Sequence, residues 1–264
     1  MLGQAKFKHT ISKLAGENKF PRFLVIQGPR GQGKKTAVKH ISQILGYPVY
    51  KPEDLKVDSI RKVIEDSQSL QKPRIYELSD SHEMTFQAQN ALLKLAEEPS
   101  RNAYIILTTE NLYGLLPTIR SRAKVITLDP YSKKELAEFT DETELVKICF
   151  NPGQIAAMLS LNWKEVLSLA DKIITSISSI SAVNTLNIYK HIEQKVGADN
   201  LEMFYDILIQ GYGEKLKEGQ AVSGEIALLY QRKPLLVNKS INKKNLLEMV
   251  FIDLREVALC SSNS

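Results

Sequence analysis

The chain has 264 residues, of which 43% are hydrophobic and 25% are charged, an ordinary composition for a globular protein with a sizeable core. No apolar run approaches the roughly 20 residues that a membrane-spanning helix needs. The N-terminus also lacks the apolar stretch of a secretory signal. We therefore expect a cytoplasmic protein that does not partner with a membrane.

The charge is mildly positive, +5, but it is unevenly distributed. Residues 1–50 hold nine lysines and arginines against a single acid, Glu17. This pattern suits a partner that carries phosphate, either a nucleotide or a nucleic acid, although a solvated surface produces the same pattern. The two cysteines, Cys149 and Cys260, are far apart, so we predict neither a metal site nor a disulfide.

Short, nearly continuous apolar runs predict the strands. Four are clear, and 47–50 is a shorter fifth candidate; the four are 23–27, 74–78, 103–107 and 124–128. Such runs are typical of strands buried on both faces of a parallel sheet. Helical patterns lie between them, so the expected fold class is α/β with a parallel sheet.

The helices between these strands carry recognisable start and stop signals. Asp58 is placed to cap a helix that carries Ile60 and Val63, and Thr85 to cap another. Pro99 predicts that this second helix has already ended.

The pattern changes near Asp129 and Pro130, after which no convincing strand is present. Apolar residues at helical spacing run through 201–208 and through 247–258, whereas the serine-rich stretch 173–181 is ambiguous. We predict that residues 131–264 are helical, with a small lid followed by a helical domain.

The first chemical motif is the segment 28–36, GPRGQGKKT, between a predicted strand and a predicted helix. In this context it matches a phosphate-binding loop of the form GxxxxGK[ST]. Gly28, Gly31 and Gly33 allow backbone N–H groups to turn toward phosphates, and Lys34 extends to the terminal ones. The alternative is a glycine-rich turn without a ligand.

The last position of this motif departs from the pattern. Lys35 stands where a serine or threonine hydroxyl normally holds magnesium. Thr36 comes one residue later, about 100° further round the helix. Nucleotide binding remains compatible with this loop, but magnesium placement is impaired.

The second motif follows the strand 74–78. Phosphate-loop ATPases end this strand in an aspartate that holds magnesium, usually followed by a glutamate that polarises water. Those two positions are Ser79 and Asp80 here. Serine supplies no carboxylate, and aspartate is shorter than glutamate.

Three segments make a family resemblance specific. Residues 85–99 resemble the "T..AQNALLK.LEEP" segment of AAA+ clamp-loader subunits, residues 107–122 resemble their "ATTE...LLPTI.SRC" segment, and residues 57–61 resemble their "VD.IR" helix start. Within that family the chain is most similar to the delta-prime subunits of bacterial DNA polymerase III. The resemblance implies a RecA-like AAA+ domain (1–130), a helical lid (131–164) and an all-helical, oligomerising collar (165–264).

The resemblance also implies roles for individual residues. Thr109, or its neighbour Thr108, matches the polar sensor after the fourth strand. Arg122 matches the arginine that enters a neighbouring subunit's ATP site as an arginine finger; the alternative is that it only pairs locally. Gln154 replaces the arginine of the second sensor loop.

Together these positions predict a subunit that is largely unable to hydrolyse ATP. Three groups of its own site are changed, Lys35, Ser79 and Gln154, whereas Arg122 is kept. The resemblance implies an interaction subunit that supports ATP-dependent loading of the sliding clamp onto primer–template DNA. Its implied partners are the other clamp-loader subunits, the clamp and DNA, in a hetero-oligomer. ATP or ADP bound without hydrolysis is compatible with this function.

Two alternatives stay open. One is an active clamp-loader ATPase of the gamma/tau kind, in which Thr36 and Asp80 take over the missing roles. The other is an AAA+-like scaffold outside replication. The chain also lacks the four-cysteine zinc module that many bacterial relatives carry. Whether the basic residues of the loop region face DNA or a nucleotide is likewise undecided; they are Arg30, Lys34, Lys35 and Lys39.

Overall fold

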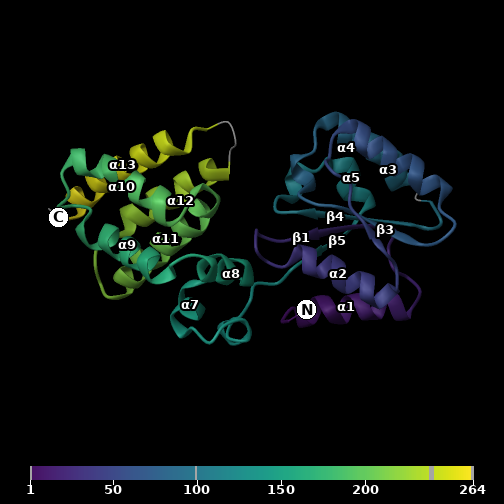
Figure 1. Ribbon diagram of the computed structural model, residues 1–264, viewed down its shortest axis with the longest axis horizontal. Helices are drawn as coiled ribbons and strands as arrows, with labels where there is room; N and C mark the ends of the chain where they lie inside the picture. The colour runs from purple at the N-terminus through teal and green to yellow at the C-terminus, as the bar shows by residue number, and fades with distance from the viewer. Residues whose placement is uncertain (1, 99, 238–240, 263–264) are drawn as a thin grey trace. The chain divides into compact units, whose positions relative to one another are not determined.

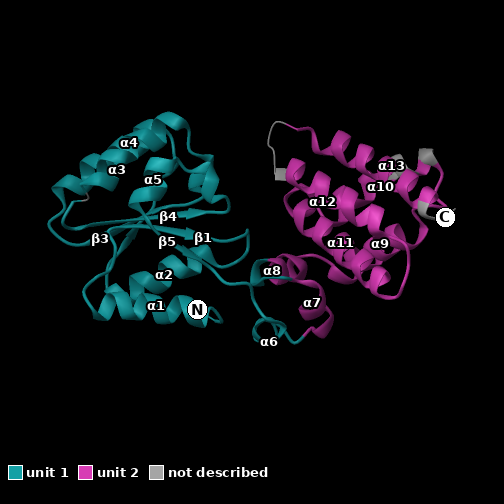
Figure 2. Ribbon diagram, turned by 180° about the vertical axis from the view of Figure 1, so that it is seen from behind, with its two compact units in different colours: residues 1–141, 150–153 teal, residues 142–149, 154–264 magenta. Residues whose placement is uncertain are grey.

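The structure, a computed structural model, describes residues 2–98, 100–237 and 241–262. The chain divides into two compact units, one of residues 1–141 and 150–153, the other of residues 142–149 and 154–264 (Figure 2). An α/β unit is followed by helical regions, which confirms the predicted fold class. The finer division into 1–130, 131–164 and 165–264 stays a prediction.

The first unit is built on a five-stranded sheet in the order β2-β3-β4-β1-β5, in which each neighbouring pair is parallel. The strands are β1 (Phe23–Gln27), β2 (Val49–Tyr50), β3 (Arg74–Leu78), β4 (Ala103–Thr109) and β5 (Lys124–Thr127). Each strand begins in the apolar run that predicted it, and only β4 continues beyond its run, by two residues to Thr109. The runs located the strands because β1, β3 and β4 are buried on both faces and carry few polar residues.

Helices cover both faces of this sheet (Figure 1). They are α1 (Ala5–Gly16), α2 (Lys34–Leu45), α3 (Val57–Ser69), α4 (Phe86–Glu97) and α5 (Pro117–Arg122). The unit also holds the short helix α6 (Lys133–Leu136) and the 3-10 helices η1 (Ser81–Glu83) and η2 (Leu112–Gly114). Successive strand residues serve opposite faces: Val25 packs with α3, α4 and α5, whereas Leu24 and Ile26 pack with α1 and α2. An apolar layer therefore lies on each face of the sheet, and the loops lie at the ends of the strands.

The helix starts in this unit confirm one predicted cap and correct another. The Thr85 hydroxyl accepts a hydrogen bond from the Ala88 N–H and caps α4, which ends at Glu97. The prediction for Asp58 is wrong, because α3 begins one residue earlier and its N-cap is Lys56. Asp58 lies in the first turn instead, where a carboxylate still favours the helix electrostatically. Pro99 lies outside the described residues.

The regular elements among the described residues of the second unit are all helices. Its helices are α7 (Thr143–Ile148), α8 (Pro152–Ser160, which begins in the first unit), α9 (Trp163–Ser176), α10 (Ala182–Lys195), α11 (Leu201–Lys217), α12 (Ser223–Val237) and α13 (Lys243–Ser262), with the 3-10 helix η3 (Ala198–Asn200). The predicted stripes in 201–208 and 247–258 are buried, and α11 packs against α9 and α12, as α13 does against α10 and α12. No helix in the described part of the chain combines the length and apolarity that crossing a membrane requires.

Candidate functional site

The glycine-rich loop lies at the carboxyl edge of the sheet, between β1 and α2. Gly31 and Gly33 have φ angles of 81° and 91°, which disfavour residues with a Cβ atom. Gly33 is the N-cap of α2 and contributes no side chain, so the first turn has no side-chain cap. The Gly28 N–H donates to the carbonyl of Thr109 at 3.1 Å and ties the loop to the end of β4. The loop thus has the backbone form that favours an anion at a helix N-terminus, and nucleotide binding by these glycines stays a prediction.

Lys34 is turned inward from the first turn of α2. Its Nζ donates to the carbonyls of Gly28 at 2.7 Å and Pro29 at 3.0 Å, and lies 3.4 Å from Oε1 of Glu110. Burial lowers the pKa of Lys34 below its ordinary value, and the Glu110 carboxylate opposes this effect. The side chain is therefore held within the loop and does not contribute to an exposed basic surface.

The next two residues of α2 face solvent. Lys35 and Thr36 are both exposed, as are Arg30 and Lys39, whereas Lys34 is 8% exposed. The Thr36 hydroxyl thus comes from a different side of the helix than the buried lysine. Of the four basic residues considered for DNA or nucleotide, Lys34 alone is buried.

Polar groups of the turn after β3 form hydrogen bonds with neighbouring residues of the same unit. The Ser79 hydroxyl donates to Oε1 of Glu77 at 2.7 Å. Asp80 has a left-handed backbone, with φ of 54°, and its N–H donates to the Thr108 hydroxyl at 3.3 Å. Its carboxylate acts electrostatically on Lys34. Asp80 therefore lies near the loop, while Ser79 is bonded to a neighbour; a role of Asp80 in nucleotide binding stays a prediction.

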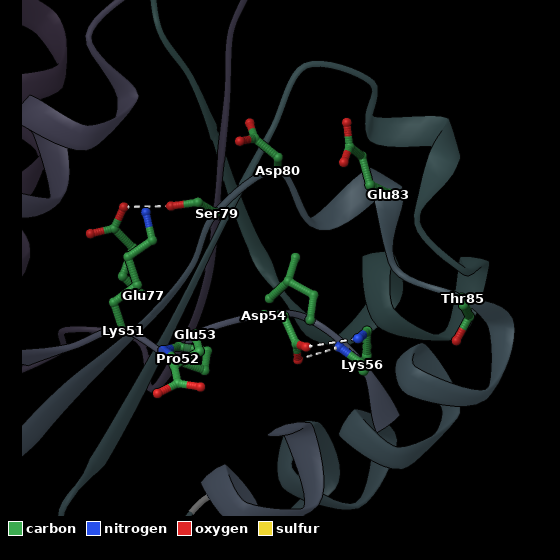
Figure 3. A pocket seen from close by; sticks show the side chains of 11 residues that line it. Lys51, Pro52, Glu53, Asp54, Lys56, Glu77, Ser79, Asp80, Glu83 and Thr85 are labelled. Carbon is green, nitrogen blue, oxygen red and sulfur yellow. Dashed lines mark hydrogen bonds and ion pairs between the residues drawn. The ribbon is translucent and has the colours of Figure 1, made fainter. Parts of the chain in front are cut away.

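A pocket of about 400 Å³ opens beside this turn, at the carboxyl ends of β2 and β3 (Figure 3). Its lining is mainly acidic, with two lysines; the charged residues are Lys51, Glu53, Asp54, Lys56, Glu77, Asp80 and Glu83. Because five carboxylates outnumber two ammonium groups, the pocket disfavours phosphate. Among the described residues, no group of three or more histidine, cysteine or acidic side chains is placed to hold a metal ion.

The predicted sensor residue, Thr109, is the last residue of β4 and is also bonded locally. The Thr109 hydroxyl donates to the carbonyl of Asn111 at 2.9 Å and accepts from its N–H at 3.2 Å. Glu110 stands between these two residues and faces Lys34. Glu110 was not among the predicted site residues. Its place at the end of β4, beside β1, is the signal that would have indicated it.

The predicted second sensor loop contacts the phosphate loop through its backbone. The Gly153 N–H donates to the carbonyl of Gly31 at 3.0 Å. A Cβ atom on Gly31 would stand 2.3 Å from Oδ1 of Asn151, so the two loops are closely packed. The side chain of the next residue, Gln154, makes its hydrogen bond elsewhere: its Nε2 donates to Oδ2 of Asp206 on α11 at 2.9 Å. Asp206 also pairs with Lys233 at 2.5 Å.

Arg122 lies at the end of α5, on the surface. Its guanidinium donates to Oε1 of Glu97 at 2.8 Å and to the carbonyl of Thr118 at 3.0 Å, and the side chain is 37% exposed. Arg120 is placed differently, with its guanidinium 4.9 Å from the ring centre of Tyr113. Of the two, Arg122 forms an exposed ion pair, the kind that a partner chain can displace at low cost.

These features define a class of protein. A five-stranded parallel sheet with a glycine-rich loop after β1, a polar turn after β3 and a polar strand end at β4, followed by helices, is the AAA+ arrangement. A crystal structure of a DNA polymerase III gamma subunit-related protein from Thermotoga maritima has this fold. It covers 94% of this chain and 98% of its own, with a TM-score of 0.54 and 17% identity.

Sequence comparison then narrows the class. The family model described as "DNA polymerase III, delta subunit" matches residues 47–132. The delta' subunit of DNA polymerase III from Bacillus subtilis is 26% identical, over 72% of this chain and 55% of that protein. The tau subunit from the same organism is 23% identical, over 96% of this chain and 52% of that protein.

The chain is therefore a relative of the DNA polymerase III delta-prime family of AAA+ clamp-loader subunits. It spans about half the length of the curated relatives that it matches.

Proposed function

We propose that this chain is a delta-prime-like clamp-loader subunit that does not hydrolyse ATP at its own site. It supplies Arg122 in trans to a neighbouring subunit's ATP site and supports the ATP-dependent loading of the sliding clamp onto primed DNA. Its partners are the other clamp-loader subunits, the clamp and primer–template DNA, in a hetero-oligomer. ATP or ADP, if held by the loop of Gly28, Gly31, Gly33 and Lys34, remains uncleaved.

One contrast carries this proposal. The groups that would place magnesium are missing or engaged elsewhere: Lys35 replaces the hydroxyl and Ser79 bonds to Glu77. Without these groups little stabilisation remains for a phosphoryl transition state. Arg122, by contrast, lies on the surface in an ion pair that can be exchanged. A chain with this combination acts on a neighbour's nucleotide.

The test is turnover of ATP by the purified chain, with magnesium, alone and after reconstitution with candidate clamp-loader subunits. We expect no turnover alone and clamp loading only when the chain is present in the complex. Turnover by the isolated chain on the order of 1–100 s⁻¹, typical of kinases, would contradict the proposal.

A second candidate is an active motor subunit of the gamma/tau kind. Two observations favour it: the similarity to the tau subunit extends over 96% of this chain, and Asp80 lies within electrostatic reach of Lys34. The double variant Lys35→Ser, Ser79→Asp separates the candidates. It should create or raise turnover if the native site is defective, and it should change little if Thr36 and Asp80 already perform the missing roles.

A further inference from the structure

The ammonium group of Lys34 has a protein partner for every proton. A lysine has three donors, and here three acceptors lie within reach: the carbonyls of Gly28 and Pro29, and the carboxylate of Glu110. The side chain is only 9% exposed, so these partners stand in for water. Two of them belong to the loop itself, and their positions follow from its fold. Glu110 is the partner that a bound phosphate would have to replace.

The backbone fixes Glu110 in this position. Thr109 is in register with Gln27, the last residue of β1, so the residue after it emerges beside the start of the loop. The Thr109 hydroxyl then bonds to both the N–H and the carbonyl of Asn111, which brackets Glu110 in a tight turn. Its side chain is 25% exposed, so the ion pair is only partly screened by solvent.

We propose that Glu110 acts as an internal substitute for phosphate on Lys34 and thereby sets the affinity of the loop for nucleoside di- and triphosphates. The phosphate of a nucleotide must displace this carboxylate from Lys34, and after binding it still lies near the negative charge of Glu110, which repels it. Ser79 stands at the position where phosphate-loop ATPases have a magnesium-holding aspartate. The acid that pairs with Lys34 in this chain is Glu110. The proposal rests on the proposed function only in taking the loop to be a nucleotide site.

Glu110 has the largest influence of the acids around Lys34. Asp80 also acts on the ammonium group, but more weakly and without a hydrogen bond to it. Arg30 acts in the opposite direction, as a like charge. A variant that removes only the charge of Glu110 therefore keeps a neutral oxygen acceptor beside Lys34 but takes away its carboxylate counter-charge. An incoming phosphate then has only a weaker, neutral partner to displace from the ammonium group.

The experiment measures binding of a fluorescent methylanthraniloyl derivative of ADP to the full chain, without any need for turnover. Glu110→Gln keeps the shape of the side chain and removes its charge, and we expect it to lower the dissociation constant at least about ten-fold. Glu110→Asp keeps the charge on a shorter side chain and should give a smaller gain. Glu53→Gln removes the same charge from the acidic pocket and is the matched control, for which we expect less than about a two-fold change.

A double variant shows whether the gain acts through the lysine. Lys34→Ala in the Glu110→Gln background should abolish the tightening. The proposal fails if Glu110→Gln binds no more tightly than Glu53→Gln, if no variant binds measurably, or if the gain survives Lys34→Ala. Thermal unfolding of each variant confirms that it is folded. Because affinity is the readout, failure here is distinguishable from failure of the proposed clamp-loader role, which turnover and reconstitution decide.

Discussion

The cationic side chains of the phosphate loop and of the end of α5 differ in burial and in the partners that they contact. Lys34 is buried, and two loop carbonyls and Glu110 take its three donors. Arg122 is 37% exposed and pairs with Glu97, itself about half exposed. The first arrangement satisfies a charge inside the chain, whereas the second leaves a charge that another chain can use. Under the proposed function, this difference is the reason why the chain acts on the nucleotide of a neighbouring subunit rather than on one of its own.

The largest expected effect comes from removing Arg122. Arg122→Ala should reduce ATP turnover at the neighbouring subunit's site by about 10³-fold or more, because the transferring phosphoryl group loses a neutralising charge. The free energy of unfolding should change by about 0.5 kcal/mol or less, since an exposed ion pair contributes little. ATPase assays of the assembled complex and urea unfolding of the isolated chain provide the two measurements.

Arg61→Ala is the matched control for this variant. Arg61 is an exposed arginine paired with Asp58 at 3.4 Å, so its removal also deletes one surface ion pair. Equal turnover in the Arg61→Ala and Arg122→Ala complexes would remove the arginine-finger assignment and with it the functional side of the comparison.

The second prediction concerns the rigidity of the phosphate loop. Gly31→Ala should lower the free energy of unfolding by about 2–3 kcal/mol, because the residue has a φ of 81° and its Cβ would meet Oδ1 of Asn151 at 2.3 Å. Gly46→Ala is the control, since Gly46 has a φ of 70° but no atom within 4 Å of the added Cβ. We expect about 1 kcal/mol there, from the backbone alone. Urea unfolding that gave equal losses would mean that Asn151 does not close over the loop.

A third change sharpens the contrast at the surface. Glu97→Gln replaces the ion pair of Arg122 by a weaker, neutral hydrogen bond, so less energy is needed to move Arg122 to a partner subunit. The concentration of this chain at which the assembled complex reaches half-maximal turnover should therefore fall by up to about five-fold. Glu98→Gln removes an adjacent exposed acid and should have no such effect. A loss of turnover in Glu97→Gln would instead mean that Glu97 positions Arg122 for its task.

The smallest expected effect is a pH dependence that arises on α2. Burial lowers the pKa of His40 below its ordinary value of 6.5. A lowered pKa means that the unfolded chain binds the proton more readily, so this contribution to stability is present above pH 6.5 and is lost as the pH falls below it. His40→Gln should flatten the loss of stability below pH 6.5 by a few tenths of a kcal/mol. Unfolding curves across this range measure it, with the exposed His9→Gln as control; equal slopes in both variants would contradict the prediction.

Much of the first unit could be predicted from local sequence. The apolar runs located the strands because a strand buried on both faces admits few polar residues. Thr85 was correctly predicted as a cap, since its hydroxyl acts within one turn of its own helix. The cap assigned to Asp58 was wrong because helix ends depend on where the preceding loop enters, and that loop brings Lys56 to the N-cap.

By itself, the sequence determined the order of the elements, the glycine-rich loop, and the chemical losses at Lys35 and Ser79, because these follow from residue type and from contacts close along the chain. The tertiary structure decided which charges meet. Glu110 lies 76 residues from Lys34, and Glu97 lies 25 residues from Arg122. The pairing of parallel strands brings the first two to the same edge of the sheet, and the packing of α4 against α5 brings the second two together. Burial at one pair and exposure at the other then set how available each cation is, and no local pattern specifies either.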